Sequence, residues 1–255
     1  MTELVKVEAA RGVLSITLAR PERRNAITVA MYEALAAALE RAAADSATRL
    51  IVFRGEGQDF AAGNDLADFL NVAPGDRSEI PVWRFLRALA SCETPLIAAV
   101  HGNCVGIGTT MLLHCDLAVA EEGTRFSMPF VDLGLVPEAA SSLLVPRLAG
   151  RRLAARYLLL GESFGVDEAE AMGLISHRAA AGELEAKVVA IVEALLAKPA
   201  EALRQTQRLL RHGTREEILD RMKLEAGRFA ERLASPEAAQ AISQFFARRS
   251  KAGPA

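Results

Sequence analysis

The chain has 255 residues, of which 51% are hydrophobic and 24% charged, and its net charge is −2. This length and balance predict a soluble globular protein with a sizeable core. Because there is no basic excess, we expect no nucleic-acid partner. The first residues contain no apolar signal core, and no apolar run is long enough to span a bilayer, so we expect a cytoplasmic protein without a membrane anchor.

The cysteines and histidines predict no metal site. Cys92, Cys104 and Cys115 are odd in number and lie in apolar sequence, which indicates buried free thiols in a reducing compartment. The four histidines form no ligand spacing with these cysteines.

Strands and helices alternate through the first part of the chain. Residues 13–19 alternate between apolar and polar side chains, as a half-buried strand does. Thr28 can cap the amphipathic helix that follows it. Residues 71–81 carry proline, glycine and aspartate, which predicts a surface loop. Further strands are predicted at residues 50–54, 96–100, 116–120 and 125–128, and helices at residues 81–92 and 109–114.

The character of the sequence changes after about residue 137, where alanine, leucine and arginine dominate. Helices are predicted at residues 143–160, 166–172, 184–196, 199–211 and 215–233. We therefore predict an α/β core domain over residues 1–195 and a helical C-terminal region over residues 196–255.

Residues 95–114 predict a strand, a glycine-rich turn and a helix. Gly102, Gly106 and Gly108 would let the backbone approach a ligand closely. The first N–H groups of the helix lack intrahelical partners and lie at the positive end of its dipole, which favours an oxyanion. A turn that serves only helix–strand packing explains the same residues, so both interpretations stay open. Met111 occupies the third glycine position of a dinucleotide fingerprint, which argues against that motif.

Residues 161–165 match the G-x-S-x-G pattern of serine hydrolases. A nucleophile elbow needs a strand before the serine, whereas the preceding residues here have helical spacing. We therefore interpret Ser163 as part of a turn between helices.

Glu138 follows Pro137 near an expected helix start. The helix dipole favours a carboxylate there, and this structural role is one interpretation. The other is that the apolar residues before Pro137 desolvate the carboxylate and raise its pKa into the range useful for a base. The residues alone leave both interpretations open.

Together these segments resemble the crotonase, or enoyl-CoA hydratase/isomerase, superfamily over nearly the whole chain. The matching motifs are Arg20-Pro-x-x-x-Asn25-Ala26, Phe60-Ala-Ala-Gly63-Asn64-Asp65-Leu66, His101-Gly-x-x-x-Gly106-x-Gly108 with Cys115-Asp116, and Phe126-x-x-Pro129 with Leu133-Gly134. The resemblance implies a ClpP-like fold of repeated ββα units, with C-terminal helices that mediate a homotrimer or a hexamer of two trimers. It also implies an acyl-CoA thioester substrate that brings its own CoA, and no metal, nicotinamide or flavin cofactor.

The resemblance also implies roles for particular residues. By position, the backbone N–H groups of Asn64 and Ile107 would form an oxyanion hole. Basic residues at the C-terminal end resemble a tail that reaches a CoA phosphate, namely Arg248, Arg249 and Lys251. The residues implied in substrate and CoA binding are Arg24, Ala26, Ala62, Gly63, Asp65, Leu66, Gly106, Phe130 and Leu133.

Departures from the family pattern favour isomerisation. Hydratases of this family use two glutamates, at positions that Thr110 and Phe130 occupy here, and neither side chain can replace a carboxylate. Glu138 matches the single glutamate of peroxisomal-type Δ3,Δ2-enoyl-CoA isomerases of fatty acid metabolism. The resemblance therefore implies that Glu138 shifts a 3-enoyl-CoA double bond to the 2-position. The alternatives are other crotonase chemistry, such as enoyl-CoA hydration or acyl-CoA hydrolysis, and a non-catalytic acyl-CoA-binding subunit.

Overall fold

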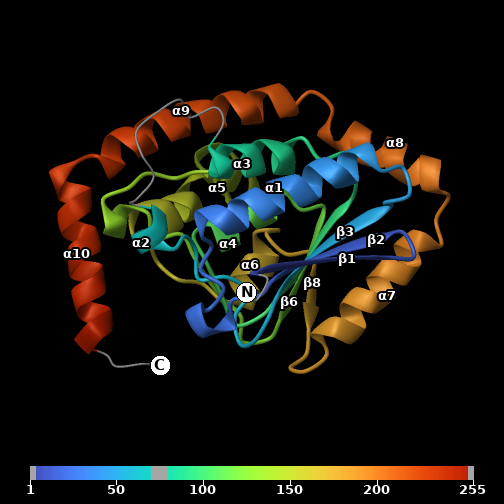
Figure 1. Cartoon of the computed structure of the whole chain (residues 1–255), viewed down its shortest axis with the longest axis horizontal. Helices are drawn as coiled ribbons and strands as arrows, with labels where there is room; N and C mark the ends of the chain where they lie inside the picture. Colours follow the sequence, from blue (N-terminus) through green and yellow to red (C-terminus); the bar gives the residue numbers. More distant parts are fainter. Residues whose placement is uncertain (1–3, 70–79, 252–255) are drawn as a thin grey trace.

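A six-stranded sheet forms the centre of the molecule in the computed structural model, which describes residues 4–69 and 80–251 (Figure 1). The strand order is β1-β2-β3-β4-β6-β8. These strands are β1 (Val5–Ala10), β2 (Val13–Leu18), β3 (Leu50–Gly55), β4 (Leu96–Val100), β6 (Leu117–Glu121) and β8 (His177–Ala179). β1 pairs antiparallel with β2, and every other pair in this sheet is parallel. Nearly all of the loop predicted at residues 71–81 lies outside the described residues.

The predicted strands follow their apolar patterns. Leu14, Ile16 and Leu18 of β2 are buried and alternate with half-buried residues, and β4 is buried along its whole length. A parallel strand covered on both faces reads as such a continuous apolar run. β1 and β8 were not predicted. β1 is a largely exposed edge strand, and β8 has only three residues that become a strand by pairing with β6.

A second, two-stranded parallel sheet joins β5 (Asn103–Val105) to β7 (Arg125–Ser127). The prediction placed residues 103–105 within the glycine-rich turn, so β5 is a correction. Pairing with β7 makes these residues extended, and that long-range contact has no signal in the local sequence.

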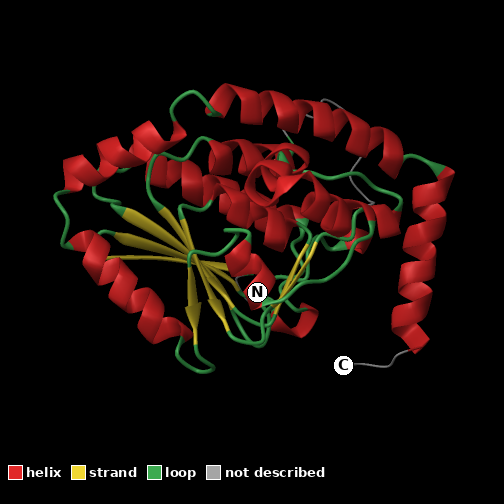
Figure 2. Ribbon diagram, turned by 180° about the vertical axis from the view of Figure 1, so that it is seen from behind, coloured by secondary structure: helices red, strands yellow, loops and turns green. Residues whose placement is uncertain are grey.

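Helices cover both faces of the main sheet (Figures 1 and 2). Thr28 Oγ1 accepts a 3.2 Å hydrogen bond from the N–H of Met31, which confirms the predicted cap of α1 (Val29–Ala44). α1 packs against α3 (Pro81–Ala90), and α7 (Leu184–Leu196) lies against β4 and β6. Val188 of α7 is fully buried among residues of β3, β4 and β6.

α5 (Ser141–Leu159) is not the continuous helix predicted for residues 143–160. Gly150 interrupts it with φ 77° and ψ 158°, a conformation that glycine adopts readily. The shorter helices are η1 (Pro21–Arg23), α2 (Leu66–Phe69), α4 (Ile107–Thr110), η3 (Met111–His114), η4 (Val131–Leu133) and α6 (Val166–Ala171). Within the described ranges, no helix combines the length and the apolar composition needed to cross a membrane.

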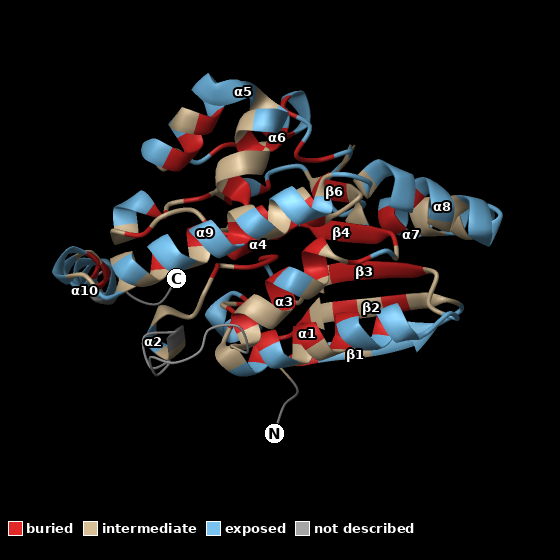
Figure 3. Ribbon diagram, turned by 90° about the horizontal axis from the view of Figure 1, so that it is seen from above, coloured by how far each residue is buried: buried red, intermediate tan, exposed pale blue. Residues whose placement is uncertain are grey.

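The C-terminal helices fold back onto their own chain. α8 (Ala200–Arg211) and α9 (Arg215–Leu233) confirm two predictions, whereas α10 (Pro236–Lys251) lies in the region predicted to be helical but was not predicted as a separate helix. The buried pair Ala238 and Ile242, four residues apart, is the helical signal that was missed. α9 lies across α3 and α5 (Figures 1 and 3). α10 packs beside η4. The domain boundary at residue 195 and a role in trimers remain predictions.

Candidate active site

The glycine-rich turn leads into α4, and the first N–H group of this helix has no hydrogen-bond acceptor among the described residues. Gly106 precedes α4 with φ 55° and ψ −119°, and its own N–H donates to the carbonyl of Ser127 at 2.9 Å. The Thr109 hydroxyl donates to the carbonyl of Cys104 and fixes the turn from inside. α4 begins at Ile107, two residues before the predicted start. Its N–H has no hydrogen-bond acceptor in the part of the chain that the structure describes.

A second turn, before α2, leaves the N–H group of Asn64 without an acceptor among the described residues as well. The N–H of Ile27 donates to Gly63, and the N–H of Asp65 donates back to Ile27. These bonds hold the segment on both sides of Asn64. Among residues 4–69 and 80–251, no acceptor lies within hydrogen-bond reach of the Asn64 N–H.

The two turns touch each other. A Cβ placed on Gly106 would lie 3.8 Å from the Cα of Gly63, and a Cβ on Gly63 would lie 3.2 Å from the carbonyl oxygen of Val105. Gly63 has φ 91°, which L-residues rarely adopt. Two main-chain donors, on Asn64 and Ile107, therefore follow two turns in close contact.

Glu138 is a buried carboxylate, with 7% of its surface exposed. The hydroxyl of Thr110, on α4, donates to Glu138 Oε1 at 3.1 Å. Burial raises the pKa of Glu138 to about 7, the Thr110 hydrogen bond opposes that rise, and the negative charge of Glu225 adds to it. α5 begins only at Ser141, so of the two interpretations the structure supports a desolvated acid.

The backbone next to Glu138 is left-handed. Ala139 and Ala140 have φ values of 57° and 56°, although neither is glycine. His114 Nε2 bonds the Ala139 carbonyl at 2.8 Å. Burial lowers the pKa of His114 to about 4. The imidazole is therefore neutral near pH 7, and Nε2 carries the proton that it donates to this carbonyl.

Tyr32, on α1, connects the two parts of the site. Its buried hydroxyl donates to Asn64 Oδ1 at 2.5 Å. Burial raises the pKa of Tyr32 well above its ordinary value, and the nearby charge of Glu138 raises it further. The phenol therefore remains a neutral donor close to both Asn64 and Glu138.

Nearly the whole chain resembles one known protein family. The enoyl-CoA hydratase/isomerase family model matches residues 8–252. The chain belongs to the enoyl-CoA hydratase/isomerase family. A crystal structure of an enoyl-CoA hydratase/isomerase from Pseudoalteromonas atlantica T6c is 39% identical and superposes with a TM-score of 0.91. It covers 96% of this chain and 98% of its own. The predicted crotonase fold is thus confirmed.

Relatives within the family carry different reaction names. Enoyl-CoA delta isomerase 2 of Rattus norvegicus is 31% identical over 97% of this chain, which spans 64% of the length of that protein. The 2,3-dehydroadipyl-CoA hydratase of Escherichia coli is 37% identical over 69% of each chain. Membership of the enoyl-CoA hydratase/isomerase family therefore does not by itself decide the reaction.

Several of the predicted CoA-binding residues lie together around the turn that carries Asn64. Arg20 Nη1 donates to the carbonyl of Ala26 at 2.9 Å and to Asp65 Oδ2 at 2.8 Å. The N–H of Ala62 donates to the carbonyl of Arg24. The Arg24 side chain is half-exposed and lies 3.5 Å from Asp59 Oδ2. Leu66 opens α2 directly after this network.

Two other predicted substrate-binding residues pack in the main core. Phe130 is buried, and Leu133 is half-buried against the same cluster. Arg248 is exposed near the end of α10, whereas the side chains of Arg249 and Lys251 lie outside what the structure describes. The contacts of these residues with a substrate remain predictions.

Ser163 is exposed in a turn between α5 and α6, so no strand precedes it. This confirms that the G-x-S-x-G match is not a nucleophile elbow. Over the described ranges, no group of three or more histidine, cysteine, aspartate or glutamate side chains could hold a metal ion.

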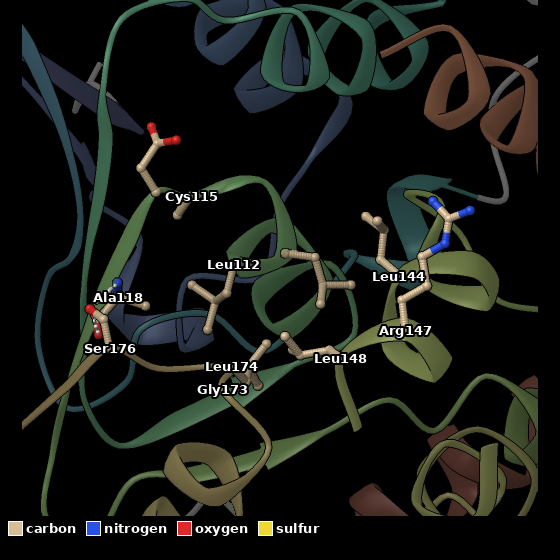
Figure 4. A pocket seen from close by; sticks show the side chains of 11 residues that line it. Leu112, Cys115, Ala118, Leu144, Arg147, Leu148, Gly173, Leu174 and Ser176 are labelled. Atoms are coloured by element: carbon tan, nitrogen blue, oxygen red, sulfur yellow. Dashed lines mark hydrogen bonds between the residues drawn. The ribbon is translucent and has the colours of Figure 1, made fainter. Parts of the chain in front are cut away.

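A surface hollow of about 300 Å³ lies elsewhere (Figure 4). Leu112, Leu148 and Leu174 line it, together with Arg147 and Asp116. None of the predicted site residues contributes to its wall. We therefore place the candidate site by its donors and its buried acid rather than by this hollow.

Sequence reasoning missed three residues that hold the site, Tyr32, His114 and Glu225. It named Thr110 only as a missing glutamate, whereas the structure makes it the hydrogen-bond partner of Glu138. A buried polar residue on an otherwise apolar helix face was the available signal for Tyr32. His114 and Glu225 act through long-range contacts that have no local pattern.

Proposed function

We propose that the chain is an acyl-CoA isomerase that moves the double bond of a 3-enoyl-CoA to the 2-position. The observation that carries this proposal is the buried carboxylate of Glu138 against Thr110. In this proposal Glu138 is the one acid/base group, and the N–H groups of Asn64 and Ile107 bind the thioester oxygen. CoA enters as part of the substrate.

The reaction balances with one proton and no cofactor. Ionised Glu138 takes a proton from C2, and the electron pair of that C–H bond passes to the thioester oxygen, which gives a dienolate. The two main-chain N–H groups stabilise the oxygen as its charge develops; one such donor is typically worth about 3 kcal/mol. Protonated Glu138 then delivers the proton to C4 as the electrons return from oxygen and the C2–C3 double bond forms.

The pKa of Glu138 supports this double role. A group with a pKa of about 7 is substantially ionised near neutral pH and, once protonated, gives the proton back readily. Burial is the main cause of this raised pKa, Thr110 moderates it by stabilising the anion, and the charge of Glu225 adds to the rise. Tyr32, which stays protonated, adds no competing base.

Hydration is the reaction to be distinguished, since hydratases are among the relatives. Adding water needs acid/base groups on either side of that water. Thr110 and Phe130 stand where the resemblance would place the two hydratase glutamates, and neither can ionise as a carboxylate does. These two residues support isomerisation.

The test offers purified protein a 3-enoyl-CoA and a 2-enoyl-CoA in separate reactions. We expect the 3-enoyl-CoA to be converted to the 2-enoyl-CoA. The Glu138→Gln variant should lose turnover by about 100- to 10,000-fold, as loss of the reaction's only base implies, while it still binds a saturated acyl-CoA by calorimetry. A 3-hydroxyacyl-CoA formed from the 2-enoyl-CoA alone would replace isomerisation with hydration. Binding without turnover of any thioester would leave a non-catalytic subunit.

A further inference from the structure

The turn after Glu138 has a backbone conformation that its own residues disfavour. Ala139 and Ala140 are both left-handed, with φ values of 57° and 56°. In this conformation the Cβ of an L-residue crowds its own backbone, so two such residues in succession persist only where their surroundings hold them. The alanine side chains form no hydrogen bonds, and the holding groups must therefore come from elsewhere in the fold.

Glu225 supplies two of these holding contacts from α9. Its Oε2 accepts the N–H of Ala140 at 2.6 Å, and its Oε1 accepts the N–H of Ser142 at 2.9 Å. Ala140 stands at the cap position of α5, and its side chain cannot cap the helix. The carboxylate of Glu225 therefore performs, across 85 residues of sequence, the task that an N-cap side chain usually performs.

The surroundings of Glu225 fit a fixed role. The side chain is 5% exposed, so both oxygens are committed to protein donors. Arg221, one turn earlier on α9, donates to the hydroxyl of Ser142 at 3.2 Å and offsets the buried charge. The hydroxyl of Ser141 donates to the carbonyl of Glu138 at 2.6 Å, which ties Glu138 to the same turn.

We propose that Glu225 is a positioning residue: by holding the amides of Ala140 and Ser142 it keeps the left-handed turn that directs Glu138 toward Thr110. This role rests on the proposed function of Glu138. Glu225 does not touch the substrate; it acts through the geometry of Glu138. In this proposal helix α9, which lies across the body of the molecule in Figure 3, fixes the position of the acid.

The test combines amide exchange with kinetics on the full-length protein. Glu225→Gln keeps one acceptor oxygen but replaces the other with an NH2 group. One of the two N–H groups, of Ala140 or Ser142, therefore loses its acceptor. We expect faster hydrogen exchange at Ala140 and Ser142 by NMR. We also expect kcat for the 3-enoyl-CoA to fall about 10- to 100-fold with KM nearly unchanged, because a small misplacement of the acid slows the chemical step. Glu217→Gln, an exposed ion-pair position on the same helix, is the matched control and should change neither.

Two further variants separate positioning from general destabilisation. In Glu225→Ala, adding Ala140→Gly should recover part of the lost kcat, because glycine enters the left-handed region without help. In a Glu138→Gln background, Glu225→Gln should lower the residual rate no further, because the two residues act as one unit.

Unchanged exchange at Ala140 and Ser142 in Glu225→Gln overturns the proposal. A fall in kcat that adds fully to that of Glu138→Gln also overturns it. A wild-type protein that is inactive on the 3-enoyl-CoA contradicts the isomerase function instead. The exchange measurement still decides whether Glu225 holds the turn, so the two failures are distinguishable.

Discussion

The hydroxyl of Thr110 donates a 3.1 Å hydrogen bond to the carboxylate of Glu138, and both side chains are buried. This contact joins the helix that presents the Ile107 amide to the loop that carries the acid. The hydrogen bond stabilises the ionised form of Glu138 and lowers its pKa, whereas burial raises that pKa. Thr110 therefore lowers the pH at which Glu138 ionises and can act as a base.

Turnover should follow the ionisation of Glu138. The ionised form is the base, so we expect kcat/KM to rise as pH increases through about 7 and to level off above it. Thr110→Val removes a donor to the anion, and the pKa of Glu138 should rise. The rising limb should then move to higher pH by about one unit, as expected for a hydrogen bond to a charged group. Thr206→Val, at an exposed position on α8, should leave the profile in place; a Thr110→Val profile that matches the wild type refutes the assignment.

Glu138 should reduce the stability of the fold at high pH. Its folded pKa of about 7 lies above the ordinary value of 4.5, so the folded protein binds the extra proton between these values. Stability therefore falls as pH rises from about 4.5 to about 7. We expect Glu138→Gln to raise the free energy of unfolding by up to about 3 kcal/mol at pH 8 and by almost nothing at pH 4. Urea unfolding measures this, with the exposed Glu231→Gln as control; an equal gain at both pH values contradicts the linkage.

The contact between the two glycine turns can be tested with a matched pair. Gly63 and Gly123 have nearly equal φ values, 91° and 89°, but only Gly63 has a neighbour that an added Cβ would crowd. Alanine at either position should lower stability by about 1–2 kcal/mol through backbone strain. Only Gly63→Ala, pressed against Val105, should displace the Asn64 amide and reduce turnover at least about tenfold. Equal activity in the two variants would show that this spacing is not critical.

Tyr32 should matter through its hydroxyl alone. Tyr32→Phe leaves the side-chain oxygen of Asn64 without its donor, which should lower the free energy of unfolding by about 1–3 kcal/mol. We also expect slower turnover, because Asn64 carries one of the two proposed donors. Tyr157→Phe removes the other tyrosine hydroxyl of the chain, whose ring packs against Phe164, and serves as control. Equal effects of the two changes would remove Tyr32 from the site.

Local patterns predicted the elements that local chemistry determines. The alternation in β2, the apolar run of β4 and the cap at Thr28 each depend on neighbouring residues, and each is confirmed. β5 and β8 depend on partner strands, so short polar segments gave no warning of them.

In the candidate site, too, local features were predictable and long-range contacts were not. Gly106, which precedes Ile107, was visible because its conformation is a local requirement, whereas Gly63 was named only through the family resemblance. The burial of Glu138 was only one of two open interpretations, because it arises where η3, α5 and α9 meet around the turn. Sequence separation of 85 residues between Ala140 and Glu225 leaves no pattern that a single sequence reveals.

That separation bears on the order in which the protein becomes functional during synthesis. The sheet and α1 through α5 are complete well before Glu225 is translated. Until then Ala140 and Ser142 lack their acceptor, and the main core lacks Met222 and Phe229 of α9. On the proposed role of Glu225, ribosomal synthesis therefore yields a working acid only after α9 has been made and has docked on α3 and α5.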